Sequence, residues 1–142
     1  MKLSEKDKDK LKRLARSVIE ASLFKKQTED ATIPDILKEK RGAFVTLKKK
    51  GELKGCIGYI KGVKPLYETV QEMAIQAAFH DPRFAPLEKD EWKDIDIEIS
   101  VLSPLKIISS IDEIEVGTHG LYIEKGFHSG LLLPQVATEN NW

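Results

Sequence analysis

The sequence predicts an α+β fold, because it contains helical segments and strand-like segments, and the latter double back as antiparallel hairpins. Residues 5–24 and 65–80 have the three- and four-residue apolar spacing of amphipathic helices. Strand-like patterns cover residues 43–60, 94–102 and 120–135. Since no repeat or long linker separates these segments, we expect one domain spanning all 142 residues, long enough to bury a real core.

The two helices are predicted from one apolar face each and from their end signals. Ser4 is placed to cap the first helix, which should lie on the outside of a sheet. Pro65 suits the first turn of the second helix, and Pro82 disfavours helical geometry at Asp81, so that helix should end there. The expected buried faces are Leu11, Leu14, Ala15, Val18 and Leu23 in the first helix, and Leu66, Val70, Met73, Ala74 and Ala77 in the second.

The segment 94–102, DIDIEISVL, is the clearest strand, with isoleucine and valine alternating with polar residues. Before it, DPRFAPLEKDEW is expected to form an ordered loop anchored by Phe84 and Leu87. A short helical turn is expected at 33–37. The final segment VATENNW is expected to open a further helix.

The hairpin AFVTLKKKGELKGCIGYI, residues 43–60, is expected to turn through a three-residue loop, Lys49 to Gly51, because this register keeps one face apolar. The expected cross-strand pairs are Lys48 with Glu52, Leu47 with Leu53, Val45 with Gly55, and Ala43 with Ile57. In this register Cys56 points away from the core face, towards the face that carries Lys54, Thr46, Phe44 and Gly58.

Charge and composition exclude several classes of protein. Lysine plus arginine and aspartate plus glutamate each number 23, so no global field favours nucleic acid or an acidic membrane. The opening MKLSEKDKDK lacks the apolar core of a signal peptide, and no later stretch is apolar enough to cross a bilayer. A single cysteine cannot form an internal disulfide, which agrees with the cytoplasmic location that we expect.

That cysteine, Cys56, lies between two glycines inside a predicted strand. Glycine weakens a strand interior, so such a pair usually marks a bulge or a close approach by another group. Two interpretations stay open. Cys56 is a nucleophile or redox centre, with Lys54 on the same face favouring the thiolate. Alternatively it is a packed residue, and Gly55 and Gly58 merely allow close packing.

Candidate acid and base groups are present, but none forms a sequence motif with Cys56. Of His80, His119 and His128, His80 is the most interesting because it ends a helix; an exposed helix-end residue is the alternative. Glu98, together with Asp96 on the same strand face, is a candidate acid/base residue, and a solvated face is the alternative.

Arg83 either holds its loop, by pairing with Asp81 or with the carboxyl terminus of a helix, or binds an anionic ligand, and we favour the structural role. The three histidines lack ligand spacing, so we expect no dedicated metal site and no cofactor. The stretch GELKGCIG also lacks the strand-to-helix context of a phosphate-binding loop.

Five stretches in order, GAFVTLKKKGELKGCIGYI, AAFHDPRFAPL, IEISVLSPL, GTHGLYI and GLLLPQVATENNW, together resemble the AMMECR domain family, also called AmmeMemoRadiSam system protein A. The family hallmark is Leu-Arg-Gly-Cys-Ile-Gly, and residues 53–58 read LKGCIG here. Lys54 in place of the usual arginine keeps the charge but loses the bidentate fork. The family also continues past the residue matched by Trp142, so we expect the chain to lack a C-terminal segment.

The resemblance implies two unequal, interleaved subdomains, each with a small antiparallel sheet, and a cleft that the hallmark stretch faces. It also implies partners, because members occur beside a Memo-like protein and a radical S-adenosylmethionine enzyme, which suggests a shared modification pathway. No activity comes with the resemblance.

Two functional hypotheses follow. The chain is a partner- or ligand-binding component of such a pathway, or it is an enzyme in which Cys56 acts on a protein or a medium-sized metabolite. We favour the first, since no complete catalytic set is visible. The expected binding residues are Leu53, Lys54, Gly55, Cys56, Ile57, Gly58 and Arg83.

Overall fold

The structure is a computed structural model, and it describes residues 3–28, 32–102, 121–125 and 128–132, the last two ranges by their backbone. The chain divides into two compact units, Met1–Leu105 and Lys106–Trp142. Helices and antiparallel strands both occur, so the predicted α+β class is confirmed. The interleaving of two subdomains stays a prediction.

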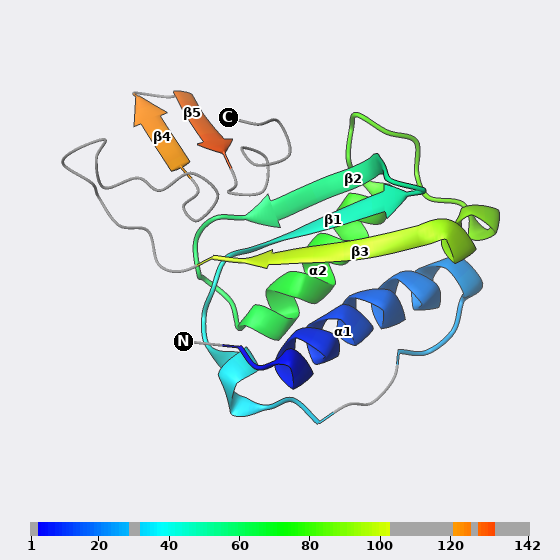
Figure 1. Cartoon of the computed structure of the whole chain (residues 1–142), viewed down its shortest axis with the longest axis horizontal. Coiled ribbons are helices and arrows are strands. Elements are labelled where there is room, and N and C mark those ends of the chain that lie inside the picture. The colour runs from blue at the N-terminus through cyan, green and yellow to red at the C-terminus, as the bar shows by residue number, and fades with distance from the viewer. Residues whose placement is uncertain (1–2, 29–31, 103–120, 126–127, 133–142) are drawn as a thin grey trace. The chain divides into compact units, whose positions relative to one another are not determined.

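The first unit is built on a three-stranded antiparallel sheet. Its strands are β1 (Ala43–Lys49), β2 (Glu52–Tyr59) and β3 (Ile95–Val101), in the order β2-β1-β3. The central strand β1 therefore pairs on both sides, and β2 lies at one edge among the described strands (Figure 1).

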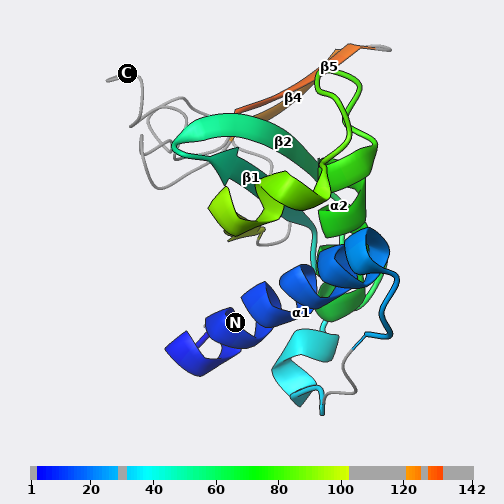
Figure 2. The same ribbon diagram turned by 90° about the vertical axis from the view of Figure 1, so that its right-hand side faces the viewer.

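Two helices, α1 (Glu5–Phe24) and α2 (Leu66–Phe79), cover one face of this sheet (Figures 1 and 2). Helix α2 packs on β1 and β2, and α1 packs on α2 and β3. The apolar core between helices and sheet includes Leu11, Ala15, Ile19, Val45, Leu47, Leu66, Val70, Met73, Ala74, Ala77, Ile95 and Ile97. Each large aliphatic side chain buried there contributes about 1.5–3 kcal/mol to folding.

The predicted start of α1 is confirmed. The hydroxyl of Ser4 accepts the backbone N–H of Asp7 at 3.2 Å, and the Asp7 carboxylate accepts the backbone N–H of Ser4 at 3.0 Å, which together form a capping box. The predicted stripe is correct except at one position, because Ile19 is fully buried while Val18 is only partly buried.

The predicted loop of the β1–β2 hairpin is wrong. Lys50 and Gly51 form a two-residue loop with φ of 50° and 83°, the positive values that a type I′ turn requires. A β-bulge follows on β2, and it absorbs one extra residue between Leu53 and Gly55. The observed pairs are Lys49 with Glu52, Lys48 with Leu53, Leu47 with Gly55, Thr46 with Cys56, Val45 with Ile57, Phe44 with Gly58, and Ala43 with Tyr59.

The bulge decides which side chains the core receives. Leu53 pairs with Lys48 and is 41% exposed, so the expected core position of Leu53 is also wrong. Beyond the bulge the alternation is as expected. Ile57 packs against the core, and Cys56 lies on the opposite face with its partner Thr46.

The segment expected to form a loop before β3 contains one helical element. Leu87 is buried as predicted, but Lys89–Asp94 forms a 3-10 helix, η2, which we did not expect. Trp92 ties η2 to α1, because its indole N–H donates to Glu20 at 2.9 Å and its ring lies 5.3 Å from the Arg16 guanidinium. A second 3-10 helix, η1 (Asp35–Lys38), corresponds to the predicted helical turn.

In the second unit the structure describes one antiparallel hairpin, β4 (Leu121–Lys125) and β5 (His128–Leu132). The predicted hairpin near Lys125 is therefore confirmed. The helix expected in VATENNW, residues 136–142, lies outside the described residues, as does His119.

Candidate functional site

Cys56, Thr46 and Glu98 form one row across the sheet, on the face opposite the helices. Thr46 of β1 is paired with Cys56 of β2 on one side and with Glu98 of β3 on the other. Their sequence neighbours, such as Val45 and Ile97, belong to the helix-covered core, and side chains alternate along a strand. The row therefore brings together Cys56 and the predicted Glu98, with Thr46 between them.

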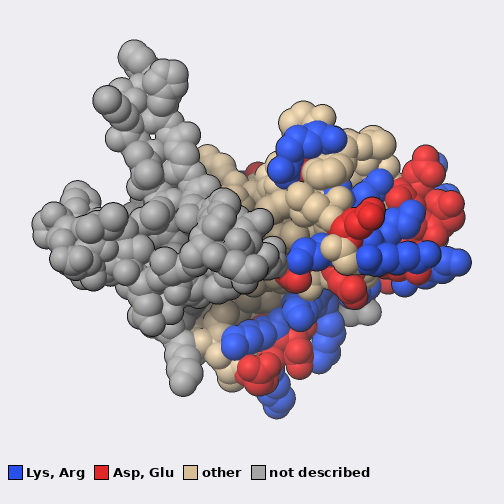
Figure 3. Space-filling model, turned by 45° about the horizontal axis from the view of Figure 1, so that its top comes forward, with Lys and Arg blue, Asp and Glu red and all other residues tan. Residues whose placement is uncertain are grey.

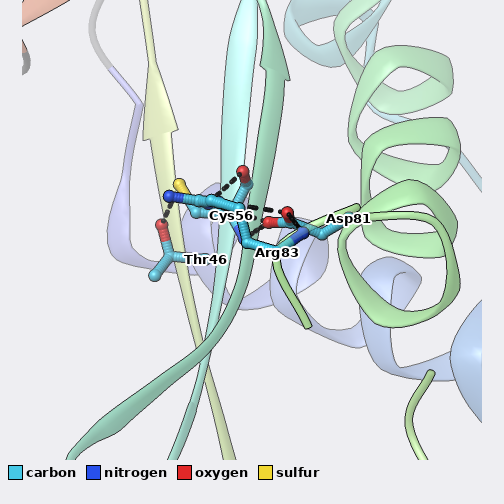
Figure 4. A network of polar contacts seen from close by, with 4 residues as sticks. All are labelled: Thr46, Cys56, Asp81 and Arg83. Atoms are coloured by element: carbon cyan, nitrogen blue, oxygen red, sulfur yellow. Dashed lines mark hydrogen bonds and ion pairs between the residues drawn. The ribbon is translucent and has the colours of Figure 1, made fainter. Parts of the chain in front are cut away.

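The Cys56 thiol and the Thr46 hydroxyl share a hydrogen bond, with 3.1 Å between Sγ and Oγ1 (Figure 4). Thr46 is 9% exposed and Cys56 is half-buried. Because the Cys56 backbone points away from β1, these residues form a non-hydrogen-bonded antiparallel pair, in which Cα atoms are only about 4.5 Å apart and side chains approach closely.

Asp81 and Arg83 bind the outward-facing backbone of Cys56 (Figure 4). The Cys56 N–H donates to Oδ2 of Asp81 at 3.0 Å, and Nη2 of Arg83 donates to the Cys56 carbonyl at 3.3 Å. The two side chains thus occupy, at one residue, the donor and acceptor positions that a neighbouring strand would fill on this side of β2, where no described strand lies.

The same two side chains form a bidentate ion pair. Nε of Arg83 donates to Oδ1 of Asp81 at 3.1 Å, and Nη2 donates to Oδ2 at 2.8 Å. The Asp81 side chain is only 2% exposed, whereas that of Arg83 is 57% exposed. The predicted pairing of Arg83 with Asp81 is confirmed.

This network holds the pKa of Asp81 far below its usual range. The bonds from the Arg83 guanidinium are the largest cause, and the backbone N–H groups of Cys56 and Arg83 add to them against the opposing effect of burial. The pKa of Arg83 is raised, chiefly by its bonds to Asp81 and to a smaller extent by the charge of the Cys56 thiolate. Arg83 is therefore a cation whose field reaches Cys56.

Asp81 follows the C-terminal end of α2, and this end positions its carboxylate beside the Cys56 backbone. His80 caps the helix with its N–H donating to the carbonyl of Gln76 at 2.8 Å, and its side chain is exposed. The Asp81 carboxylate also accepts the backbone N–H of Arg83 at 3.1 Å, a local turn typical of aspartate. The predicted base His80 thus lies beside the network in sequence, and no hydrogen bond joins its side chain to Cys56 in the described structure.

Both glycines around Cys56 are explained by packing. A Cβ on Gly55 would lie 2.1 Å from the backbone oxygen of Ala77, so the glycine lets α2 pack directly against β2. A Cβ on Gly58 would lie 2.2 Å from the ring of Phe44 on the cross-strand partner. The close approach that the sequence indicated is made by groups of the chain itself.

Lys54 binds Glu91 of η2, with 3.1 Å between Nζ and Oε2, and Lys49 binds the same oxygen at the same distance. Burial opposes ionisation of Glu91, but the N–H of Glu88 and the two ammonium groups outweigh it and lower the pKa of Glu91. The ammonium of Lys54 is thus engaged by Glu91. The expected action of Lys54 on the thiol stays a prediction.

The remaining candidates make no contact with Cys56 in the described structure. Glu98, in the same row, is half-exposed and pairs with Lys48 at 3.3 Å, and Asp96 is exposed. Leu53 lies in the hairpin beyond the bulge, and the side chain of His128 lies outside the described part of the structure. Sequence analysis did not nominate Thr46 or Asp81 as site residues, although the cross-strand register and the turn-forming aspartate after a helix were both visible signals.

Charge is mixed on the face shown in Figure 3, where acidic and basic side chains are interspersed over the described surface. Within the described residues, no three His, Cys, Asp or Glu side chains gather closely enough to hold a metal ion. No helix in that same part of the chain is both long and apolar enough to cross a membrane.

Comparison with known proteins agrees with the resemblance of the five sequence stretches. The profile of the AMMECR1 family matches residues 12–142. The chain belongs to the AMMECR1 family. Among its curated relatives, a protein of Methanothermobacter thermautotrophicus is 47% identical over 99% of this chain and 77% of its own length. Protein MJ0810 of Methanocaldococcus jannaschii is 43% identical over 92% of this chain and 69% of its own length.

A solved structure has a similar fold. The crystal structure of the uncharacterized protein PH0010 from Pyrococcus horikoshii superposes with a TM-score of 0.92 at 38% identity. The match covers 100% of this chain and 76% of that one.

Proposed function

We propose that this AMMECR1 chain binds a partner protein or ligand through the sheet face that carries Cys56, Thr46 and Glu98, which we name the row face. One observation carries the proposal. The Cys56 thiol lies opposite the helix-covered core on a backbone fixed by Asp81, and its hydrogen-bonding partner among the described residues is the hydroxyl of Thr46. A rigid, half-buried contact of this kind suits recognition.

The alternative is an enzyme that uses Cys56 as nucleophile or redox centre. A nucleophilic thiol is normally activated by an adjacent base or by a strongly favoured thiolate. The Thr46 hydroxyl is not a base, and the Arg83 charge near Cys56 is largely compensated by Asp81. These contacts support binding over catalysis.

The partners that we propose are a Memo-like protein and a radical S-adenosylmethionine enzyme, within a cytoplasmic modification pathway. The same proposal includes binding at the stretch LKGCIG. Both features come from the family resemblance.

Binding measurements with charge-reversed variants test the proposal. The row-face variant Glu98→Lys and the control Asp9→Lys, on the exposed side of α1, make the same change in charge at two surface positions. Calorimetric titration of each proposed partner with the full chain should show binding that Glu98→Lys weakens at least tenfold and Asp9→Lys leaves unchanged. Equal affinities for the two variants, or no binding of either partner to the wild type, would contradict the proposal.

A further inference from the structure

We propose that Arg83 gives this site a preference for an oxyanion, a phosphate or carboxylate group of the bound ligand, which the Nη1 edge of its guanidinium contacts beside Cys56. The inference rests on the proposed function, because it names the chemistry of the ligand at the same site.

The guanidinium is held in place by groups on two segments. Nε and Nη2 donate to Asp81 at 3.1 and 2.8 Å, and Nη2 also donates to the Cys56 carbonyl at 3.3 Å. Its central carbon lies 5.2 Å from the centroid of the Phe84 ring. These contacts fix both the position and the plane of the guanidinium.

These contacts leave one nitrogen of the Arg83 guanidinium, Nη1, without a described hydrogen-bond partner. An arginine carries five N–H donors, and the contacts to Asp81 and Cys56 use Nε and Nη2. Nη1 has no hydrogen-bond partner among the described residues, and the Arg83 side chain is 57% exposed. Two N–H groups of a charged, oriented guanidinium are thus available next to Cys56 (Figure 4).

The unequal burial of the ion pair favours a role beyond holding the loop. The Asp81 side chain is almost fully buried, and a single bond from Arg83 to it would be enough to hold the loop. Most of the Arg83 side chain nevertheless remains exposed. An exposed arginine normally loses much rotamer freedom when it binds an anion, whereas Arg83 is already fixed in the free protein. Its planar donors match the geometry of carboxylate and phosphate oxygens.

Asp81 also limits the affinity, because it compensates much of the guanidinium charge. We therefore expect an isolated ion to bind weakly, with a dissociation constant on the order of 1 mM, and a larger ligand to gain affinity from its contacts with the row face.

Nuclear magnetic resonance titration of the full chain, labelled with ¹⁵N, tests the inference. Inorganic phosphate and acetate are the probes, and chloride at matched ionic strength is the reference. The Nε–H signal of Arg83 and the amide signal of Cys56 should shift saturably with phosphate, acetate or both, while the Nε–H signal of the exposed Arg13 should not. Phosphate alone or acetate alone would identify the preferred group. Shifts equal to those in chloride, or no shift at Arg83, would overturn the inference.

Two variants separate the effect of the planar guanidinium donors of Arg83 from the effect of its charge. Arg83→Gln should abolish the saturable shift at Cys56, and Arg83→Lys should retain less than a tenth of the affinity, because lysine keeps the charge but not the planar donors. The control Arg13→Gln should titrate like the wild type. If Arg83→Gln does not fold, the wild-type titration decides the question by itself. A saturable shift at Cys56 that persists in a folded Arg83→Gln protein would also overturn the inference.

Failure here is distinguishable from failure of the proposed function. If phosphate and acetate leave Arg83 unaffected while Glu98→Lys still weakens partner binding, the ligand chemistry is wrong and the row face stands. If Arg83 binds the probes but neither partner binds the chain, the proposed function is wrong and the ligand chemistry of Arg83 stands.

Discussion

The carboxylate of Asp81 accepts the backbone N–H of Cys56 at 3.0 Å, across 25 positions of sequence. This contact joins the end of helix α2 to the side of β2 on which no described strand pairs. Its donor is the residue whose thiol lies on the row face. The position of that thiol therefore depends on the buried carboxylate of Asp81, which Arg83 pairs with in the loop that follows α2.

Replacing Asp81 should destabilise the protein strongly. Asp81→Ala leaves the part-buried N–H of Cys56 without its acceptor, at a cost of about 1–3 kcal/mol, whereas water can solvate the exposed Arg83 guanidinium. Asp96→Ala, at an exposed position of β3, should change the free energy of unfolding by less than about 0.5 kcal/mol. Urea denaturation measures both, and equal values would show that the ion pair has no stabilising role.

Stability should also fall with acid in a way that depends on Asp81. The pKa of this carboxyl is lowered in the folded state by Arg83 and the backbone N–H groups, so the unfolded chain binds the proton more readily. The contribution of Asp81 is therefore complete well above the unfolded pKa of about 3.9 and is lost as pH falls from about 5 towards the lower folded pKa. Urea denaturation from pH 7 to pH 3 should show a steeper loss for the wild type than for Asp81→Asn. Parallel curves would exclude Asp81 as the cause.

Gly55→Ala should be more damaging than a change at the hairpin turn. Its Cβ would lie 2.1 Å from the backbone oxygen of Ala77, so α2 or β2 must move, at a cost of about 1–3 kcal/mol. Gly51→Ala meets no neighbouring atom and suffers only from its φ of 83°, a cost of about 1 kcal/mol. Thermal unfolding of the two variants compares them. A smaller loss at Gly55 than at Gly51 would contradict the direct packing of α2 on β2.

Arg83, and not Lys54, should be the cation that influences the reactivity of the thiol. Nη2 of Arg83 donates to the Cys56 carbonyl at 3.3 Å, whereas the Lys54 ammonium binds Glu91. Arg83→Gln removes this hold on the Cys56 backbone and should therefore raise the rate at which iodoacetamide alkylates the half-buried Cys56 thiol severalfold at pH 7.5. Lys54→Gln should leave the rate within twofold. The opposite order of effects would restore Lys54 as the group acting on Cys56.

The parts of the fold that depend on nearby residues were predictable. The spacing of Ser4 and Asp7 is typical of a helix N-terminus and indicates the start of α1. The alternation of Ile95, Ile97 and Ile99 with polar residues indicates β3. The face on which Cys56 lies was also predictable. Side chains alternate along a strand, so placing the neighbouring Ile57 in the core puts Cys56 on the opposite face.

The parts that depend on distant contacts were not. The two-residue turn places a lysine at positive φ, which its residue type does not indicate, and the bulge beside Leu53 has no sequence signature. Helix η2 is stabilised by the contacts of Trp92 with Glu20 and Arg16, about 70 residues earlier in the chain. The bond from Cys56 to Asp81 likewise requires knowledge of where α2 ends relative to β2.

Protection of Cys56 by a partner is the most direct test of a binding role for the row face. The chain contains one cysteine, so its alkylation is measured from the mass of the intact protein. When the Memo-like protein or the radical S-adenosylmethionine enzyme is added in saturating amounts, alkylation of Cys56 should slow at least fivefold, and Asp9→Lys should behave like the wild type. A complex that forms while Cys56 reacts at its free rate would contradict binding through the row face.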